Sequence, residues 1–306
     1  MQVPAAYFLV VLIWSTTPLA IHWSNSSLSF VAAITLRMAL ALPLCFLLMK
    51  ILREPLIRNK RDWWAYAASA LGLFPNMLLV YWAAQFISSG LMSVMFGIYP
   101  FFVGLFSLVI LRENPFTVAK VLALLLAILG LWVLQRDSIA AGSDAVWGIA
   151  AMILVCVVWG FSSVVVKKLA VDVSPSRMGA GSLLLSSPFF LLAWFWLDGE
   201  WPLEMQQKSL LAVVYLVLAG SLLGHVLWFY VLRACSVTSV SLISLITPVM
   251  ALTWGLLFAG EIPSSQTLLG AGLILSALVL YQGVFAHSLR FLRRNTKLLR
   301  RFGEKV

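Results

Sequence analysis

Three polar side chains lie inside apolar stretches of the sequence, where they could bind a ligand or carry a proton. Arg37 lies within AITLRMALALP, Asn76 within LFPNMLLV and His225 within LLGHVLWFYVL. Polar groups in such surroundings are costly to bury, so they are retained where a partner or a function requires them. Arg37 could tie neighbouring helices together, or it could bind an anion or belong to a gate. His225 could donate to a nearby backbone carbonyl, or it could contact a ligand or switch with protonation.

Aromatic side chains form a second group with binding chemistry. Those that lie within apolar runs and away from the ends are Trp14, Tyr81, Tyr99, Trp159 and Phe229. Each could simply pack in the core, and others such as Trp63 flank the runs as interfacial anchors do. Ring faces stack on flat groups and attract cations, so a box of rings with few charges suits a neutral, zwitterionic or cationic small molecule. A phosphorylated compound would instead require several buried basic residues.

Enzymatic chemistry finds little support in the sequence. Only three histidines occur, and no two acidic residues share the interior of one apolar run. Cys45, Cys156 and Cys235 have no metal-binding spacing, and no glycine-rich loop is present that could cradle nucleotide phosphates. We therefore expect no catalytic residues, no metal, no cofactor and no direct use of ATP.

The composition excludes a water-soluble domain. Hydrophobic residues make up 62% of the 306 and charged residues 10%, whereas soluble domains average about 45–50% and about 25%. A bilayer core of about 30 Å requires roughly 20 helical residues, and the apolar runs have about this length. We place ten of them, at 4–22, 29–50, 63–84, 88–111, 116–135, 145–166, 178–197, 209–232, 238–259 and 266–286.

These runs predict helices, because lipid cannot satisfy the hydrogen bonds of an irregular backbone. None of them alternates as the strands of a membrane barrel do. The first run lacks the basic start and the cleavage site of a signal peptide, so we expect it to be a transmembrane span. The fold class is therefore an all-α membrane protein with ten transmembrane helices.

The positions of the lysines and arginines predict the orientation of these spans. If the N-terminus is cytoplasmic, every Lys and Arg except Arg37, Arg136 and Lys208 falls on the cytoplasmic side. Both termini are then cytoplasmic. The basic tail at 288–306 could lie as an amphipathic helix on anionic lipid, or it could be a simple basic anchor. Because the basic residues lie between apolar runs, the net charge of +10 does not indicate a nucleic-acid partner.

The chain also contains a repeat. Pro100 and Glu113 of the fourth run are matched by Pro248 and Glu261 of the ninth, at one constant offset. We therefore divide the chain into repeats at 1–137 and 143–287, followed by the tail. Five spans in each repeat give the two copies opposite orientations, as in secondary transporters with a site near the middle of the membrane.

The duplicated prolines and glutamates have two interpretations each. Pro100 and Pro248 would kink their helices and so shape an internal cavity, although prolines are also common in membrane helices. Glu113 and Glu261 would lie at opposite faces of the membrane, each before a turn. They could cap a helix or form an ion pair there, or they could act as latches of a gate.

Two segments carry a resemblance to a known family. They are YWAAQFISSGLMSVMFGIYPFFVGLFSLVILRENP, which begins at Tyr81, and FYVLRACSVTSVSLISLITPVMALTWGLLFAGEIP, which begins at Phe229. The chain resembles the drug/metabolite transporter superfamily, specifically the ten-helix EamA-type permeases, over roughly residues 4–286. The resemblance implies an inverted bundle of five plus five helices. It also implies a cavity lined by the first, third and fourth helices of each repeat, and export of metabolites or amino acids, as in many bacterial members.

Together these observations predict a secondary transporter in the bacterial inner membrane, working by alternating access. Its substrate would be a small neutral, zwitterionic or cationic metabolite, for example one like an amino acid. Export is the direction that the resemblance implies, import or facilitated exchange is the alternative, and a channel is less favoured. We expect a monomer or a homodimer in the lipid bilayer. The predicted substrate-binding residues are Trp14, Asn76, Tyr81, Tyr99, Trp159, His225 and Phe229, and the predicted gating residues are Pro100, Glu113, Pro248 and Glu261.

Overall fold

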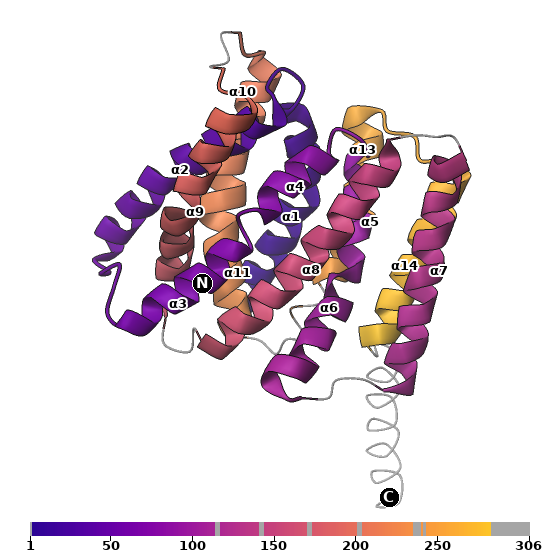
Figure 1. The fold of residues 1–306 in the computed structure, drawn as a ribbon, viewed down its shortest axis with the longest axis horizontal. Helices are drawn as coiled ribbons and strands as arrows, with labels where there is room; N and C mark the ends of the chain where they lie inside the picture. Colours follow the sequence, from indigo (N-terminus) through magenta and orange to yellow (C-terminus); the bar gives the residue numbers. More distant parts are fainter. Residues whose placement is uncertain are drawn as a thin grey trace, which may run out of the picture.

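The computed structural model describes residues 2–113, 117–140, 144–169, 173–200, 204–234, 240 and 243–282, with the backbone alone at 134–140, 244, 245 and 282. Every element within these residues is helical, and they contain no strand. The predicted basic tail at 288–306 lies outside the described residues. The all-α prediction is confirmed for this part of the chain (Figure 1).

The helices of the first half begin with α1 (Val3–Ser24) and α2 (Phe30–Leu52). The chain continues through α3 (Lys60–Leu71), α4 (Asn76–Ala83), α5 (Ser89–Met95), the 3₁₀ turn η1 (Phe96–Ile98), α6 (Tyr99–Phe106), the π-helical segment η2 (Ser107–Leu111) and α7 (Val118–Ala140). The second half contains α8 (Ala145–Leu169), α9 (Pro175–Leu197), α10 (Gln207–Tyr215), the π-helical segment η3 (Leu216–Leu223), α11 (Gly224–Ala234), α13 (Ile243–Ala259) and α14 (Ser265–Gln282).

Within the described residues, seven helices are long and apolar enough to cross a membrane. They are Val3–Ser24, Phe30–Leu52, Lys60–Ala83, Ser89–Leu111, Ala145–Leu169, Pro175–Leu197 and Gln207–Ala234. Three shorter apolar helices, Val118–Val133, Ile246–Ala259 and Ser265–Tyr281, lie where the fifth, ninth and tenth spans are predicted. The protein is therefore a multi-pass membrane protein, and the count of ten spans stays a prediction.

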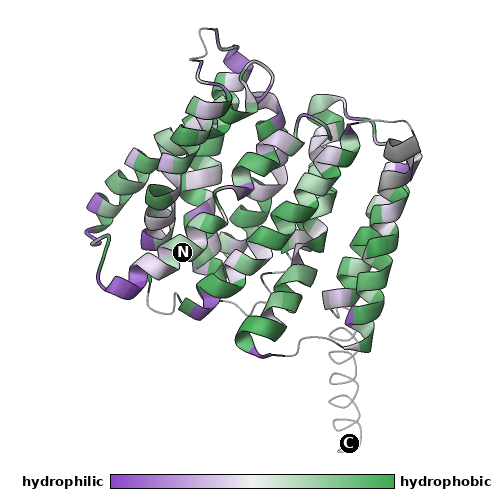
Figure 2. Ribbon diagram, in the orientation of Figure 1, coloured by the Kyte–Doolittle hydropathy of each residue, from purple (hydrophilic) through white to green (hydrophobic). Residues whose placement is uncertain are grey.

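The outer surface of the bundle is apolar, and polar side chains are found inside it. Figure 2 shows that the helices are hydrophobic over most of their length, with hydrophilic residues gathered mainly near their ends. On α9, Phe195 and Trp196 are exposed, as lipid-facing residues are, while the serines of this helix are buried against its neighbours. Ser182 and Ser187 of α9 each donate to a carbonyl of the preceding turn. Small hydroxyl side chains of this kind allow membrane helices to approach closely without leaving an unpaired donor.

The two halves pack about matching elements. The second span pairs with its counterpart, α2 with α9, and the fourth and fifth do the same, α5 with α13 and α7 with α14. The third span contacts the sixth through α4 and α8, and the eighth contacts the first through α11 and α1. Contacts of this reciprocal kind are those that a two-fold relation between two copies produces. Figure 1 shows α7 and α14 side by side at one edge of the bundle.

Among the described residues, three of the spans are broken inside the bundle. The third is interrupted between α3 and α4 at Gly72–Pro75, the fourth passes through η1 before Pro100, and the eighth contains η3. Proline removes a backbone donor and clashes with the preceding turn, which accounts for the first two breaks. Pro248 differs, because α13 continues through it, as α1 continues through Pro18.

Glu261 caps a helix of the other half. Its carboxylate accepts hydrogen bonds from the backbone N–H groups of Ser89 and Gly90 and from the Ser89 hydroxyl, at the start of α5. A carboxylate in this position satisfies orphan donors and favours the positive end of the helix dipole. Glu113, its counterpart in the repeat, is exposed.

A buried ion pair joins the halves at another place. Asp62 accepts from the backbone N–H groups of Arg58 and Asn59 at the start of α3, and it forms a salt bridge with Arg177 of α9. Both side chains are almost fully buried. Removal of one partner would leave an unpaired buried charge, so this contact fixes α3 against α9.

Candidate functional site

A cavity of about 100 Å³ lies in the interior, between the two halves. Its lining comes from the first, third and fourth spans of the first half and from the corresponding sixth, eighth and ninth spans of the second. The residues are Trp14, Thr17, Pro18, Ile21, Met77, Val80, Ser93, Phe96, Tyr99, Trp159, Gly220, His225, Trp228, Val240, Ile243 and Thr247, with Arg37 from α2 in addition. This is the set of helices that the family resemblance implies, plus one side chain from the second span.

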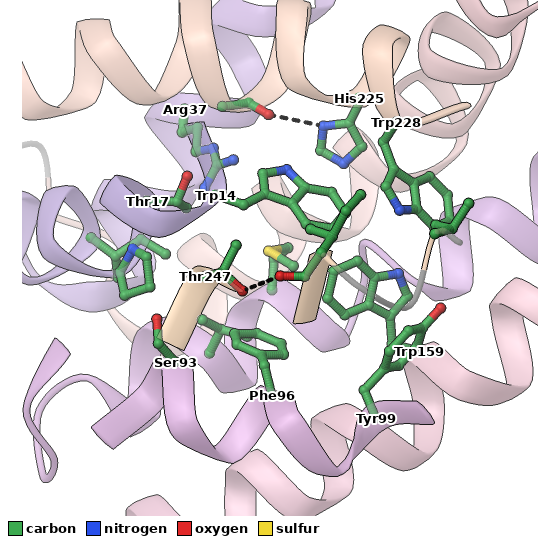
Figure 3. A pocket seen from close by; sticks show the side chains of 17 residues that line it. Trp14, Thr17, Arg37, Ser93, Phe96, Tyr99, Trp159, His225, Trp228 and Thr247 are labelled. Carbon is green, nitrogen blue, oxygen red and sulfur yellow. Dashed lines mark hydrogen bonds between the residues drawn. The ribbon is translucent and has the colours of Figure 1, made fainter. Parts of the chain in front are cut away.

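A cluster of three tryptophans forms one wall of this cavity. The ring centroid of Trp14 lies 5.3 Å from that of Trp159 and 5.9 Å from that of Trp228, and the last two lie 6.2 Å apart. Tyr99 and Phe96 extend the cluster, with centroids 5.1 and 5.5 Å from that of Trp159 (Figure 3). Such tilted and edge-on contacts stabilise aromatic clusters beyond their burial.

The same tryptophans separate the main cavity from a smaller one. The smaller cavity measures about 30 Å³ and shares Trp14, Trp159, Trp228, Met77 and His225 with the first. Its other walls come from α3, the α3–α4 break, α8 and α11, namely Ser69, Gly72, Leu73, Ser162, Ser163, Val166 and Phe229. The interior is therefore divided by a layer of aromatic rings, which would have to move if a ligand passed between the cavities.

Arg37 is the charged side chain of the main cavity. It is 2% exposed, and its Nε donates to Ser221 Oγ at 2.8 Å while Nη1 lies 3.4 Å from the Tyr81 hydroxyl. Gly220 leaves room for it, because a Cβ at that position would stand 2.9 Å from Nη2. Gly220 and Ser221 belong to η3, and π-helical segments of this kind often occur at functional sites.

His225 is oriented by the same segment. Its Nδ1 lies 3.2 Å from the carbonyl oxygens of both Gly220 and Ser221. Carbonyl oxygens only accept hydrogen bonds, so Nδ1 carries the proton and Nε2 is left to interact with a ligand. The backbone contact foreseen for His225 therefore exists together with its place in the cavity wall (Figure 3).

The predicted site residues fall into three groups. Trp14, Tyr99, Trp159 and His225 line the main cavity, and Phe229 lines the smaller one. Asn76 and Tyr81 are buried but line neither cavity. The Tyr81 hydroxyl contacts Arg37 instead, and the side-chain amide of Asn76 has no hydrogen-bond partner among the described residues.

Several lining residues were not predicted. Thr17, Ser93, Phe96, Trp228 and Thr247 all contribute to the main cavity. Trp228 could have been found, because it follows His225 by three residues and so shares its helix face. The others carry no signal that separates them from ordinary core residues.

The composition of the lining is that of a binding site. Apolar and aromatic walls with a few placed polar groups are the usual composition of a small-molecule site. No acidic residue lines the cavity, and no group of three His, Cys, Asp or Glu side chains within the described residues could hold a metal ion.

Replacement of Trp159 by alanine tests this wall. The change removes the ring that contacts Trp14, Tyr99 and Phe96. Loss of the contact between this ring and the ligand, worth about 0.5–1.5 kcal/mol, should weaken ligand binding by about 2- to 12-fold. A panel of amino acids, amines and carboxylates is first screened for the compound that stabilises the wild-type protein most. The dissociation constant of that compound is then measured for the wild type and the variant by thermal-shift titration of purified protein.

The matched control is Trp196→Ala, which removes the same side chain from a position that is 82% exposed on the outer surface. It should leave the dissociation constant unchanged. Equal affinities for the Trp159 variant and the wild type would place the ligand elsewhere.

Comparisons with known proteins agree with this architecture. The family model described as EamA-like transporter family matches residues 4–136 and again residues 146–282. An uncharacterized transporter of Archaeoglobus fulgidus is 27% identical over 273 residues, which cover 87% of this chain and 94% of that protein. The uncharacterized transporter YoaV of Bacillus subtilis is 25% identical, covering 93% and 96%. A solved crystal structure at 20% identity shares the fold, with a TM-score of 0.68 over 94% of this chain and 98% of its own. The chain belongs to the EamA-like transporter family.

Proposed function

We propose that this protein is a secondary transporter that exports a small metabolite across the bacterial inner membrane by alternating access. The observation that carries the proposal is the main cavity, whose walls come from corresponding helices of the two halves. Sites near the bilayer midplane at the interface of inverted repeats are typical of secondary transporters. The aromatic walls suit a neutral, zwitterionic or cationic substrate, for example one like an amino acid.

In this proposal the protein has ten transmembrane helices with both termini in the cytoplasm. The three shorter apolar helices then complete the five spans of each half. The distribution of Lys and Arg supports this orientation, because the exposed Lys60, Arg112 and Lys168 then lie on one side. Glu261 and the start of α5 lie on the opposite, outer side. The protein works as a monomer or a homodimer within the lipid bilayer.

Movement would occur where the spans are broken. We expect the two halves to rock about the cavity, with Pro100 and Pro248 shaping the helices that form its walls. The contact of Glu261 with Ser89 and Gly90 joins the outer ends of the fourth and ninth spans. Release of a substrate to the outside would require these ends to separate, so Glu261 would act as a latch as well as a cap. Glu113 occupies the corresponding position at the cytoplasmic face.

The direction of transport rests on the resemblance to exporting members of the family. Import or exchange of a small metabolite is the alternative, and both use the same cavity. Uptake into everted and right-side-out membrane vesicles separates them, because an exporter accumulates the substrate in everted vesicles and an importer accumulates it in right-side-out vesicles.

Counterflow in proteoliposomes tests the proposal. Liposomes loaded with an unlabelled substrate, identified by comparing secreted metabolites with and without overexpression, should accumulate the labelled compound transiently and saturably. Pro100→Ala and Pro248→Ala should insert normally but slow this flux, since straighter helices reshape the cavity walls. A flux that does not saturate and shows no counterflow indicates a channel, and unchanged rates in both variants would remove the prolines from the mechanism.

Cysteine labelling tests the orientation. In a variant without native cysteines, single cysteines at Asn59 and Lys168 should resist an impermeant thiol reagent in intact cells. Cysteines at Asp144 and Glu204 should react, because all four positions are exposed but lie on opposite faces in the proposed topology. The reverse pattern would overturn both the orientation and the position of the latch.

A further inference from the structure

Arg37 indicates which charges the substrate carries. We propose, resting on the proposed transport function, that Arg37 binds a carboxylate of the substrate. The protein then carries small carboxylates, zwitterionic amino acids included, and rejects compounds whose only charge is positive. Compared with the range that the aromatic walls alone suggest, this excludes purely cationic compounds and adds monocarboxylates.

Burial of the positively charged Arg37 side chain is energetically unfavourable. Arg37 is 2% exposed and lies within α2, about two turns from its start. An arginine side chain does not lose its proton in proteins, so burial cannot be relieved by neutralisation. A buried charge is strongly unfavourable unless an opposite charge and hydrogen bonds compensate it.

None of the described residues provides a carboxylate partner for Arg37. Asp62 and Arg177 form the salt bridge found there, and Arg37 has none. The carboxylates whose side chains are described, Glu54, Asp62, Glu113, Asp144, Asp198, Glu200, Glu204 and Glu261, lie at helix ends or between helices. Both hydrogen-bond partners of Arg37, Ser221 and Tyr81, are neutral. The other buried arginine, Arg177, differs from Arg37 because it is paired with the carboxylate of Asp62.

Several N–H groups of the Arg37 guanidinium remain available to a ligand in the cavity. A guanidinium has five N–H groups, and the two bonds to Ser221 and Tyr81 use one each on Nε and Nη1. No described residue accepts from the others. Because Arg37 lines the main cavity, an anion inside it can receive a paired hydrogen bond from the guanidinium edge (Figure 3).

The other cavity residues suit the part of the substrate that remains beside its carboxylate. Trp14, Trp159 and Tyr99 offer ring faces to an apolar or aromatic remainder. The same faces can accept the ammonium of a zwitterion. His225 is the other basic side chain in the lining, and its Nδ1 is already bonded to backbone carbonyls. A lone cation would meet Arg37 with no carboxylate in the lining to offset the repulsion.

Matched ligand sets test this assignment by binding alone. One set is phenylalanine, 3-phenylpropionate and phenethylamine, and a second is leucine, 4-methylpentanoate and 3-methylbutylamine. The dissociation constants are measured by thermal-shift titration of the purified full-length protein. In the wild type the zwitterion or the monocarboxylate of a set should bind at least about tenfold more tightly than the amine, as expected for charge-assisted hydrogen bonds.

Arg37→Gln should weaken the carboxylate-bearing ligands by about tenfold or more and improve binding of the amine, so that the preference is lost or reversed. Lys208→Gln is the matched control, because it removes one positive charge from a lysine that lies over the Trp23 ring outside the cavity. It should change no dissociation constant. A purely structural role of Arg37 would weaken all ligands alike, and that result would overturn the proposal.

A second variant covers the case in which Arg37→Gln fails to insert. Gly220→Ala places a Cβ 2.9 Å from Nη2 and should displace the guanidinium, which would again reduce the affinity for carboxylates selectively. Amines that bind as tightly as carboxylates in the wild type, or no binding in either set, would contradict the assignment. Counterflow of amines alone would refute the carboxylate site but leave the transport function intact, whereas carboxylate binding without counterflow would do the opposite.

Discussion

A bilayer offers no hydrogen-bond partner, so a polar group inside this protein is costly unless the protein or a ligand supplies one. This constraint explains why serines of α9 donate to their own helix and why Asp62 and Arg177 form a buried pair. It also explains the cap that Glu261 provides to α5. The same constraint singles out Arg37, whose charge is not matched by any described carboxylate.

The cavity lies where the helices depart from regular geometry. The breaks in the third, fourth and eighth spans all border it, through Met77, Phe96 and Gly220. Irregular backbone at membrane depth is tolerated where it is buried in protein or lines a cavity. Regular helices such as α7 and α14 pack together at the edge instead. The irregular segments therefore lie at the cavity, and the regular helices α7 and α14 lie at the edge of the bundle.

Much of this organisation could be predicted from the sequence, since apolar run length and an internal repeat both follow from the membrane environment. Trp14, Trp159, Tyr99 and His225 were predicted as site residues because they combine depth with a chemically distinct side chain, and all four line the cavity. The direction in which side chains point after a break in a helix could not be predicted. Asn76 begins α4 directly after the break at Pro75, and it is buried away from the cavities. The lining that the family resemblance implies does not include the second span, which carries Arg37. The Arg37 side chain reaches the cavity beside the π-helical segment that contains Gly220 and Ser221, and no sequence pattern indicated this segment.

The proposed mechanism of alternating access requires that the main cavity opens to each face of the membrane in turn. Ser93 lines this cavity and is 3% exposed, so Ser93→Cys in a variant without native cysteines reports on access with little change in size. An impermeant thiol reagent should label this cysteine both in right-side-out and in inside-out vesicles, while the same vesicles remain impermeable to protons. Labelling from one face only, or labelling from both faces together with a proton leak, would contradict alternating access.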